Sequence, residues 1–185
     1  MIVSESYGFA FFHVPKTAGS AVTVALSDYS TVGSPVSKAL REPGWQNTYH
    51  EGGMYMRVSQ SPRDLDDFYT FAFVRNPFDT IASLYAKSGY RDFSEYVANR
   101  GWTSQLVWTQ SQMLDGWIDY IGEYETLEAD WEEICRYIGI DHSPLTNVNT
   151  TKNKKDYRTY YTDTEIQIVA DIFDDDLTKF GYSFD

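Results

Sequence analysis

The chain has 185 residues, of which 42% are hydrophobic and 17% aromatic, so it can bury a sizeable core and is not a disordered protein. No apolar run approaches the 18 residues of a transmembrane helix. The net charge of −12 argues against nucleic acid and anionic membranes as partners. We therefore expect one cytoplasmic domain that spans residues 1–185.

The first predicted unit is a strand followed by a helix. The apolar and aromatic run Gly8–Val14 predicts a short buried strand. Small and apolar residues at helical spacing from Ala18 to Tyr29 predict a helix. Pro15 ends strand pairing between them, and Gly19 allows a close turn.

Such a junction favours an anion, because free backbone N–H groups and the positive end of a helix point at one place. Lys16 adds a mobile positive charge, and Thr17 and Ser20 add hydroxyl donors. The usual ligand is a phosphate. The loop is not a Walker A loop, because its lysine precedes the glycine.

Residues 30–67 are rich in proline and glycine and have no periodicity. Long irregular segments of this kind are usually functional or mobile. This one contains His50 and Glu51, two side chains that can accept a proton from a substrate.

A second strand and helix follow. The run Phe68–Val74 predicts a buried strand, and Asn76 and Pro77 are typical of the start of a helix. Ser83 shares a helix face with Asn76, and Arg75, just before the helix, is long enough to reach over that face. Arg75 and Ser83 can therefore hold a second phosphate. An ion pair at the helix end is the alternative role for Arg75.

The rest of the chain supplies scaffold. A strand is predicted at 117–122, then an amphipathic helix that ends at Gly139. A capping box at Thr162 and Glu165 opens a last helix. The predicted core-facing residues are Leu127, Trp131, Ile134 and Ile138 in the first helix, and Ile166, Val169, Phe173 and Leu177 in the second.

Two motifs resemble those of sulfotransferases that use 3′-phosphoadenosine 5′-phosphosulfate (PAPS). His-Val-Pro-Lys-Thr-Ala-Gly-Ser at 13–20 resembles the loop that binds the 5′-phosphosulfate in carbohydrate sulfotransferases. Phe-Val-Arg-Asn-Pro-Phe-Asp-x-x-x-Ser at 73–83 resembles the segment that binds the 3′-phosphate. Thr80 departs from the pattern, since many relatives have arginine there. The polar stretch 146–157 resembles the loop that folds over the nucleotide.

The resemblance implies a three-layer α/β/α domain like the P-loop nucleotide hydrolases. Its mainly parallel central sheet would have the two motif strands side by side, with the nucleotide across their carboxyl ends. The nucleotide contacts that the resemblance implies are made by Pro15, Lys16, Thr17, Ala18, Gly19, Ser20, Ala21, Arg75, Ser83, Thr151 and Lys152.

The chemistry that the resemblance implies is transfer of the sulfonyl group of PAPS to a hydroxyl, most suitably of a carbohydrate, with adenosine 3′,5′-bisphosphate as product. Lys16 would stabilise the leaving oxygen. His50 matches the position of the general base, with Glu51 as the alternative, whereas His13 is expected to pack beside the loop. No metal is required, and Cys135 and three scattered histidines form no metal pattern.

Two other functions stay open at this point. A P-loop phosphotransferase would need a Walker A loop and an acid that holds Mg²⁺. A nucleotide-binding module without catalysis would bind the nucleotide and not turn it over. A small or terminal sugar, or another small alcohol, suits this short chain as well as a polysaccharide does.

Overall fold

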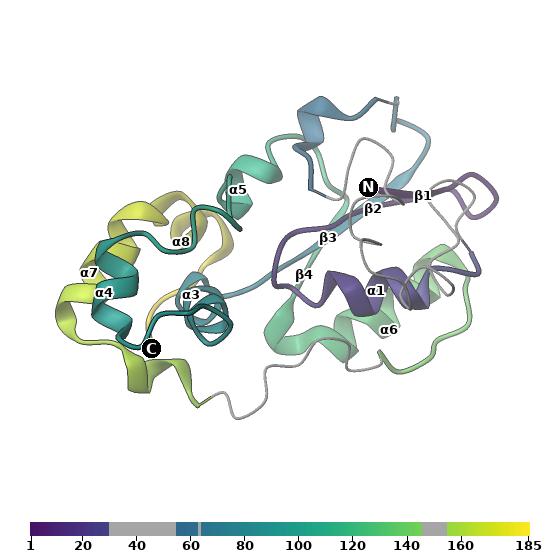
Figure 1. The fold of residues 1–185 in the computed structure, drawn as a ribbon. Coiled ribbons are helices and arrows are strands. Elements are labelled where there is room, and N and C mark those ends of the chain that lie inside the picture. Colours follow the sequence, from purple (N-terminus) through teal and green to yellow (C-terminus); the bar gives the residue numbers. More distant parts are fainter. Residues whose placement is uncertain (30–54, 63, 146–154) are drawn as a thin grey trace. The chain divides into compact units, whose positions relative to one another are not determined.

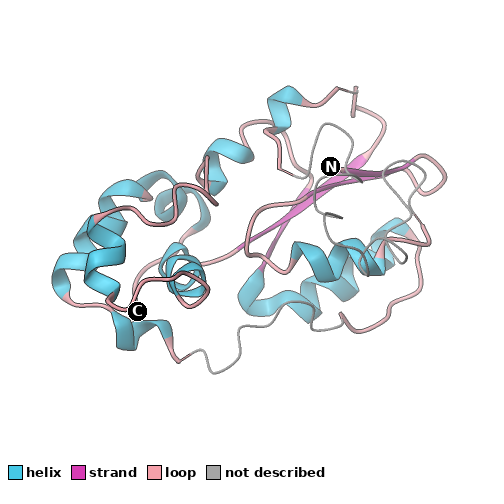
Figure 2. Cartoon of the chain, in the orientation of Figure 1, coloured by secondary structure: helices cyan, strands magenta, loops and turns pink. Residues whose placement is uncertain are grey.

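The computed structural model describes residues 1–29, 55–62, 64–145 and 155–185. The chain divides into two compact units, one formed by residues 1–74 and 112–148 and the other by residues 75–111 and 149–185. In Figures 1 and 2, the strands belong to the first unit, and the described part of the second unit consists of helices and loops. The expectation of a single domain stays a prediction.

The first unit is built on a sheet with the order β1-β2-β3-β4 (Figure 1). Its strands are β1 Ile2–Ser4, β2 Phe9–Phe12, β3 Tyr69–Val74 and β4 Tyr120–Glu123. β1 is antiparallel to β2, and the other two pairings are parallel, with Phe11 opposite Phe71 and Phe71 opposite Tyr120. The prediction of an α/β protein with a mainly parallel sheet is confirmed, and the two motif strands are neighbours. The sequence reading missed β1 and placed β4 too early.

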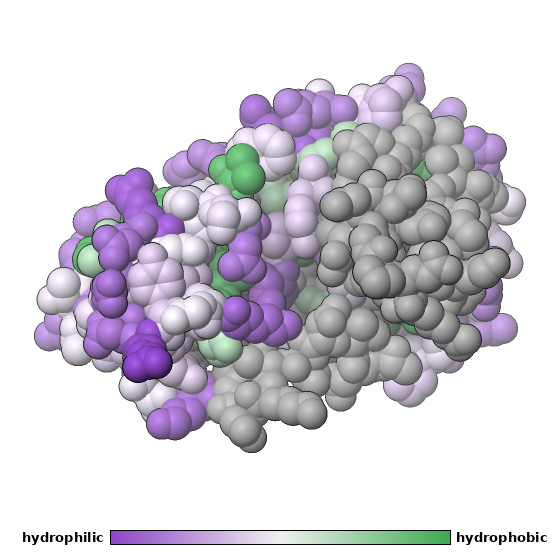
Figure 3. Space-filling view, viewed as in Figure 1, coloured by the Kyte–Doolittle hydropathy of each residue, from purple (hydrophilic) through white to green (hydrophobic). Residues whose placement is uncertain are grey.

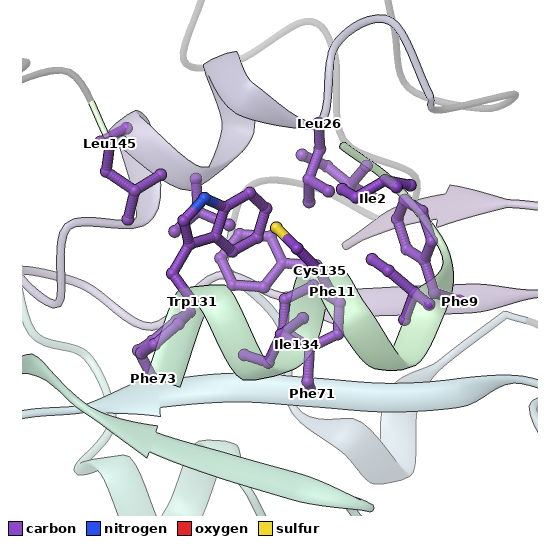
Figure 4. Packing of buried hydrophobic residues seen from close by; sticks show 14 residues of the cluster. Ile2, Phe9, Phe11, Leu26, Phe71, Phe73, Trp131, Ile134, Cys135 and Leu145 are labelled. Atoms are coloured by element: carbon purple, nitrogen blue, oxygen red, sulfur yellow. The ribbon is translucent and has the colours of Figure 1, made fainter. Parts of the chain in front are cut away.

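Helices α1 (Gly19–Ala25) and α6 (Leu127–Ile138) pack on one face of this sheet. Figure 4 shows Trp131 and Ile134 of α6 above the strand side chains Phe71 and Phe73. Burial of such large side chains is the main source of stability, at about 25 cal/mol per Å² of apolar surface. The helix ends at Gly139, whose φ of 74° only glycine adopts without strain.

The second unit has its own aromatic core. Its helices pack through residues of α3, α4 and α7, with Trp102 and Tyr157 from the loops and short turns between them. The helices of this unit are α3 Pro77–Tyr85, α4 Phe93–Ala98, α7 Asp163–Ile172 and α8 Asp174–Phe180, and α5 Gln110–Met113 crosses into the first unit. The described residues also contain short 3₁₀ turns, at Val58–Gln60 and Tyr124–Thr126 in the first unit and at Tyr157–Tyr160 in the second.

One helix prediction was wrong in length. The apolar spacing from Ile166 to Leu177 indicated one continuous helix, but the structure has two, α7 and α8, joined at Phe173. Phe173 has φ −109° and ψ 24°, which interrupts the helical path while its ring stays buried. The predicted capping box of Thr162 and Glu165 is present at the start of α7.

Hydrophilic residues cover much of the described surface in one view of the molecule (Figure 3). In the view of Figure 3, the part formed by the helical unit is mainly hydrophilic, with small separate hydrophobic areas. None of the helices in the described ranges is both long and apolar enough to cross a membrane.

The capping box makes stability depend on pH. Burial alone would raise the pKa of Glu165, but hydrogen bonds from the side chains of Thr162 and Ser94 and from the Thr162 backbone N–H outweigh it and lower the pKa. Such a carboxylate stabilises the fold above its unfolded pKa, and this contribution is lost as the pH falls through the lower folded pKa.

We therefore expect Glu165→Gln to lower the free energy of unfolding by about 1 kcal/mol at pH 7. The difference from the wild type should shrink as the pH falls below about 4, where the carboxylate becomes protonated. Urea unfolding between pH 3 and pH 7 measures it. Exposed Glu132 is the control, and Glu132→Gln should follow the wild-type profile. A constant difference across the whole range would contradict this role.

A buried phenol in the second core gives another prediction. Tyr96 is fully buried, and its hydroxyl has no hydrogen-bond partner among the described residues. Tyr161, by contrast, donates to the Phe78 carbonyl at 2.8 Å. We expect Tyr96→Phe to raise the free energy of unfolding by about 1 kcal/mol and Tyr161→Phe to lower it by about as much. Equal losses in both variants would show that the Tyr96 hydroxyl is bonded.

Candidate functional site

The loop between β2 and α1 has an unusual backbone. Lys16 and Ala18 have positive φ values, 71° and 62°, which residues other than glycine seldom adopt, and Thr17 between them does not. Residues of alternating hand turn successive N–H groups toward one side of the chain, which makes a concave site for an anion. The first N–H groups of α1 also lack acceptors within the helix. This backbone is compatible with a bound anion, and the phosphate site itself stays a prediction.

Contacts within the loop hold this shape. The Thr17 side chain is fully buried, and its hydroxyl donates to the Val14 carbonyl at 3.0 Å. The Thr17 hydroxyl therefore donates its proton to a hydrogen bond within the loop, and not to an anion. Lys16, Ala18 and Ser20 are half-buried, whereas Pro15, Gly19 and Ala21 are buried.

The ring of His13 lies directly against Gly19. A Cβ atom on Gly19 would be 2.0 Å from Cδ2 and 2.2 Å from Nε2 of that ring. The ring also stacks on Phe11 and meets the edge of Tyr55, at centroid distances of 5.9 and 5.3 Å. These are the contacts of a packing residue, and they leave room only for glycine at position 19.

The start of α3 carries the second motif. The Asn76 side chain accepts from the Phe78 N–H at 3.0 Å, and Pro77 is the first helical residue, so the predicted N-cap is confirmed. The Asn76 amide also donates to the Ser183 carbonyl at 2.7 Å. The helix start is therefore tied to the C-terminal segment, 107 residues later in the chain.

Arg75 forms an ion pair with Asp79 in the first turn of α3. Its Nη2 and Nε lie 2.5 and 2.9 Å from Oδ2 of Asp79, and its side chain is 5% exposed. The alternative role considered for Arg75, an ion pair at the helix end, is thus present. Ser83 lies one further turn along the same face from Asp79 and is buried. Asp79 and Ser83 thus share one face of α3, and Arg75, which precedes the helix, is joined to that face by its ion pair with Asp79.

Asp79 also affects a neighbouring phenol. Burial, and after it the negative charge of Asp79, raises the pKa of Tyr161. The Tyr161 hydroxyl therefore stays protonated at physiological pH and donates its hydrogen bond to Phe78. The Asp79 carboxylate, which pairs with Arg75, therefore lies close to the partly buried Tyr161 side chain.

The predicted site residues are divided between the two units. Residues 15–21 belong to the first unit, and Arg75 and Ser83 to the second. His50, Glu51, Thr151 and Lys152 lie outside the described residues, so their assignments stay predictions. No group of three His, Cys, Asp or Glu residues within the described ranges is arranged to hold a metal ion.

Neither of two partners of Arg75, Asp79 and Gln110, was identified from the sequence. Its partner Asp79 is four residues away, and this i,i+4 spacing was a usable signal. The second contact is with Gln110, which pairs with the Arg75 backbone from 35 residues away. No sequence pattern indicates that pairing.

A model of a known protein family matches this chain. The model of the sulfotransferase family matches residues 1–183, nearly the whole chain and both units. Comparison with curated protein sequences gives no match.

The contact between His13 and Gly19 is testable. Gly19 does not have a positive φ, so an added methyl acts only through the clash with the imidazole. We expect Gly19→Ala to lower the free energy of unfolding by about 2 kcal/mol. In the background of His13→Ala the same change should cost about 1 kcal/mol less. Gly89, whose added Cβ would meet nothing within 4 Å, is the control. Additive losses in the double variant would contradict the contact.

Proposed function

The chain belongs to the sulfotransferase family, and we propose that it transfers the sulfonyl group of PAPS to a hydroxyl of a carbohydrate. The observation that carries the proposal is the loop after β2, in which Lys16 and Ala18 have positive φ values. A backbone of this kind turns N–H groups toward one side, where a phosphate or phosphosulfate would bind beside Lys16. Arg75 follows the last residue of the neighbouring parallel strand β3 and would bind the 3′-phosphate.

The reaction is an in-line displacement at sulfur. The acceptor oxygen forms a bond to sulfur while the bond between sulfur and the 5′-phosphate oxygen breaks, and adenosine 3′,5′-bisphosphate leaves. The acceptor proton passes to a base, for which we propose His50. Lys16 and the N–H groups of residues 17–20 stabilise the charge that grows on the leaving oxygen.

The residues fit the nucleotide in two ways. A guanidinium has five N–H donors in a planar fork, so the ion pair of Arg75 with Asp79 is compatible with a phosphate contact. The missing side chain of Gly19 makes room for the His13 ring, which packs against the loop whose N–H groups would meet the phosphate. In our proposal the 3′-phosphate positions the nucleotide without touching the reacting bond.

Calorimetric titration with adenosine 3′,5′-bisphosphate, AMP and Mg²⁺-ATP tests the nucleotide assignment. We expect the bisphosphate to bind most tightly, because the 3′-phosphate meets Arg75. Arg75→Ala should weaken it at least tenfold and leave AMP unchanged, whereas Lys16→Ala should weaken both. Exposed Arg91 supplies the control variant Arg91→Ala, which should bind like the wild type.

Transfer from labelled PAPS to a panel of sugars then tests the reaction itself. His50→Ala should lower kcat by about 10²–10⁴-fold without changing nucleotide affinity. Preference for Mg²⁺-ATP would contradict the proposal in favour of a phosphotransferase. Binding of the bisphosphate with no transfer to any acceptor would favour a module without catalysis.

A further inference from the structure

A buried chain of polar side chains leads to Arg75. The Arg75 N–H donates to Oε1 of Gln110 at 2.9 Å, and Nε2 of Gln110 donates to the Arg75 carbonyl at 2.8 Å. One carboxamide thus satisfies both backbone groups of the residue that follows β3. It takes the place of a partner strand at the point where the sheet pairing of β3 ends.

Gln110 is held in turn by Asp176. The two oxygens of this carboxylate accept from the backbone N–H groups of Gln110, at 3.0 Å, and Ser111, at 2.7 Å. A longer contact of 3.4 Å joins Nε2 of Gln110 to the same carboxylate. The carboxylate therefore caps the start of α5 and orients the Gln110 amide.

Burial separates this aspartate from its neighbours. Asp174, Asp175 and Asp176 are consecutive in the first turn of α8, and the first two are exposed, whereas Asp176 is fully buried. Removing a carboxylate from water is costly unless hydrogen bonds replace its hydration. The N–H groups of α5 supply them, so Asp176 has a fixed place in this network.

All the residues of the network belong to the second unit: Asp79 to α3, Gln110 to α5 and Asp176 to α8, with Arg75 directly before α3 (Figure 1 shows these helices). Gln110 fixes the backbone of Arg75, and Asp79 fixes its guanidinium. A guanidinium that is fixed before binding loses little conformational entropy when it takes up a phosphate. The network thus prepares one charged group, which is the one assigned to the 3′-phosphate.

We propose that Gln110 and Asp176 are positioning residues that set Arg75 for the 3′-phosphate of the nucleotide. Neither residue touches the nucleotide in this account, and both act through Arg75. The inference rests on the proposed function, since it takes the 3′-phosphate as the ligand of Arg75.

The test compares adenosine 3′,5′-bisphosphate with AMP, which lacks the 3′-phosphate. Gln110→Met keeps the side-chain length and removes both hydrogen bonds to Arg75. We expect it to weaken binding of the bisphosphate about tenfold, because a displaced Arg75 would lose a charge-assisted hydrogen bond to the 3′-phosphate, and to leave AMP affinity unchanged. Gln112→Met is the matched control on the same helix, where the side chain is exposed, and it should bind both nucleotides like the wild type.

Asp176→Asn is the second, milder variant, because the amide keeps an acceptor oxygen for α5. We expect a selective loss of about threefold for the bisphosphate, and an unchanged kcat at saturating PAPS with a raised KM. Thermal unfolding of each variant reports whether it folds. A purely structural role would weaken both nucleotides equally or lower thermal stability alone.

The outcomes separate the two proposals. If the wild type prefers the bisphosphate and the Gln110→Met and Asp176→Asn variants keep that full preference, the positioning role is overturned and the proposed function stands. If the wild type binds both nucleotides equally, the assignment of Arg75 to the 3′-phosphate fails, and this inference fails with it. A Gln110→Met variant that does not fold leaves the decision to the selectivity of Asp176→Asn.

Discussion

Parallel pairing of β2 with β3 is the constraint on which the rest of this account depends. Because the strands run in one direction, their carboxyl ends lie at the same edge of the sheet. In this register Phe12 is opposite Ala72. One strand leads into the left-handed loop with Lys16, and the other leads directly into Arg75. Apolar burial adds to the backbone hydrogen bonds of this pairing, through rings such as Phe11 and Phe71 packed under α6.

Arg75 illustrates how an acidic protein holds a buried cation in a fixed position. Asp79 balances its charge, and Gln110 forms hydrogen bonds with its backbone N–H and carbonyl groups. Both the side chain and the backbone of Arg75 therefore have partners. An isolated buried charge would cost several kcal/mol, which hydrogen bonds and a paired carboxylate offset. A phosphate that binds Arg75 would therefore meet a side chain that Asp79 and Gln110 already hold in place.

Much of the fold could be predicted from the sequence because its signals are local. Apolar runs indicated β2 and β3, and Asn76, Gly139 and the capping box at Thr162 marked helix ends correctly. The break at Phe173 and the strand β1 were missed, because tertiary packing decides both. Gln110 could not be found at all, since its partners Arg75 and Asp176 lie 35 and 66 residues away. Gln110 and Asp176 bind mainly to backbone groups, which every residue type carries. Such contacts do not produce a recognisable sequence motif.

The central claim is that the two strand-to-helix junctions bind one nucleotide, and a crystal structure with adenosine 3′,5′-bisphosphate tests it most directly. The account predicts the 5′-phosphate about 3 Å from N–H groups of residues 16–20 and the 3′-phosphate at the Arg75 guanidinium, with Gln110 still paired to its backbone. A nucleotide bound elsewhere, or a 3′-phosphate that does not touch Arg75, would contradict it.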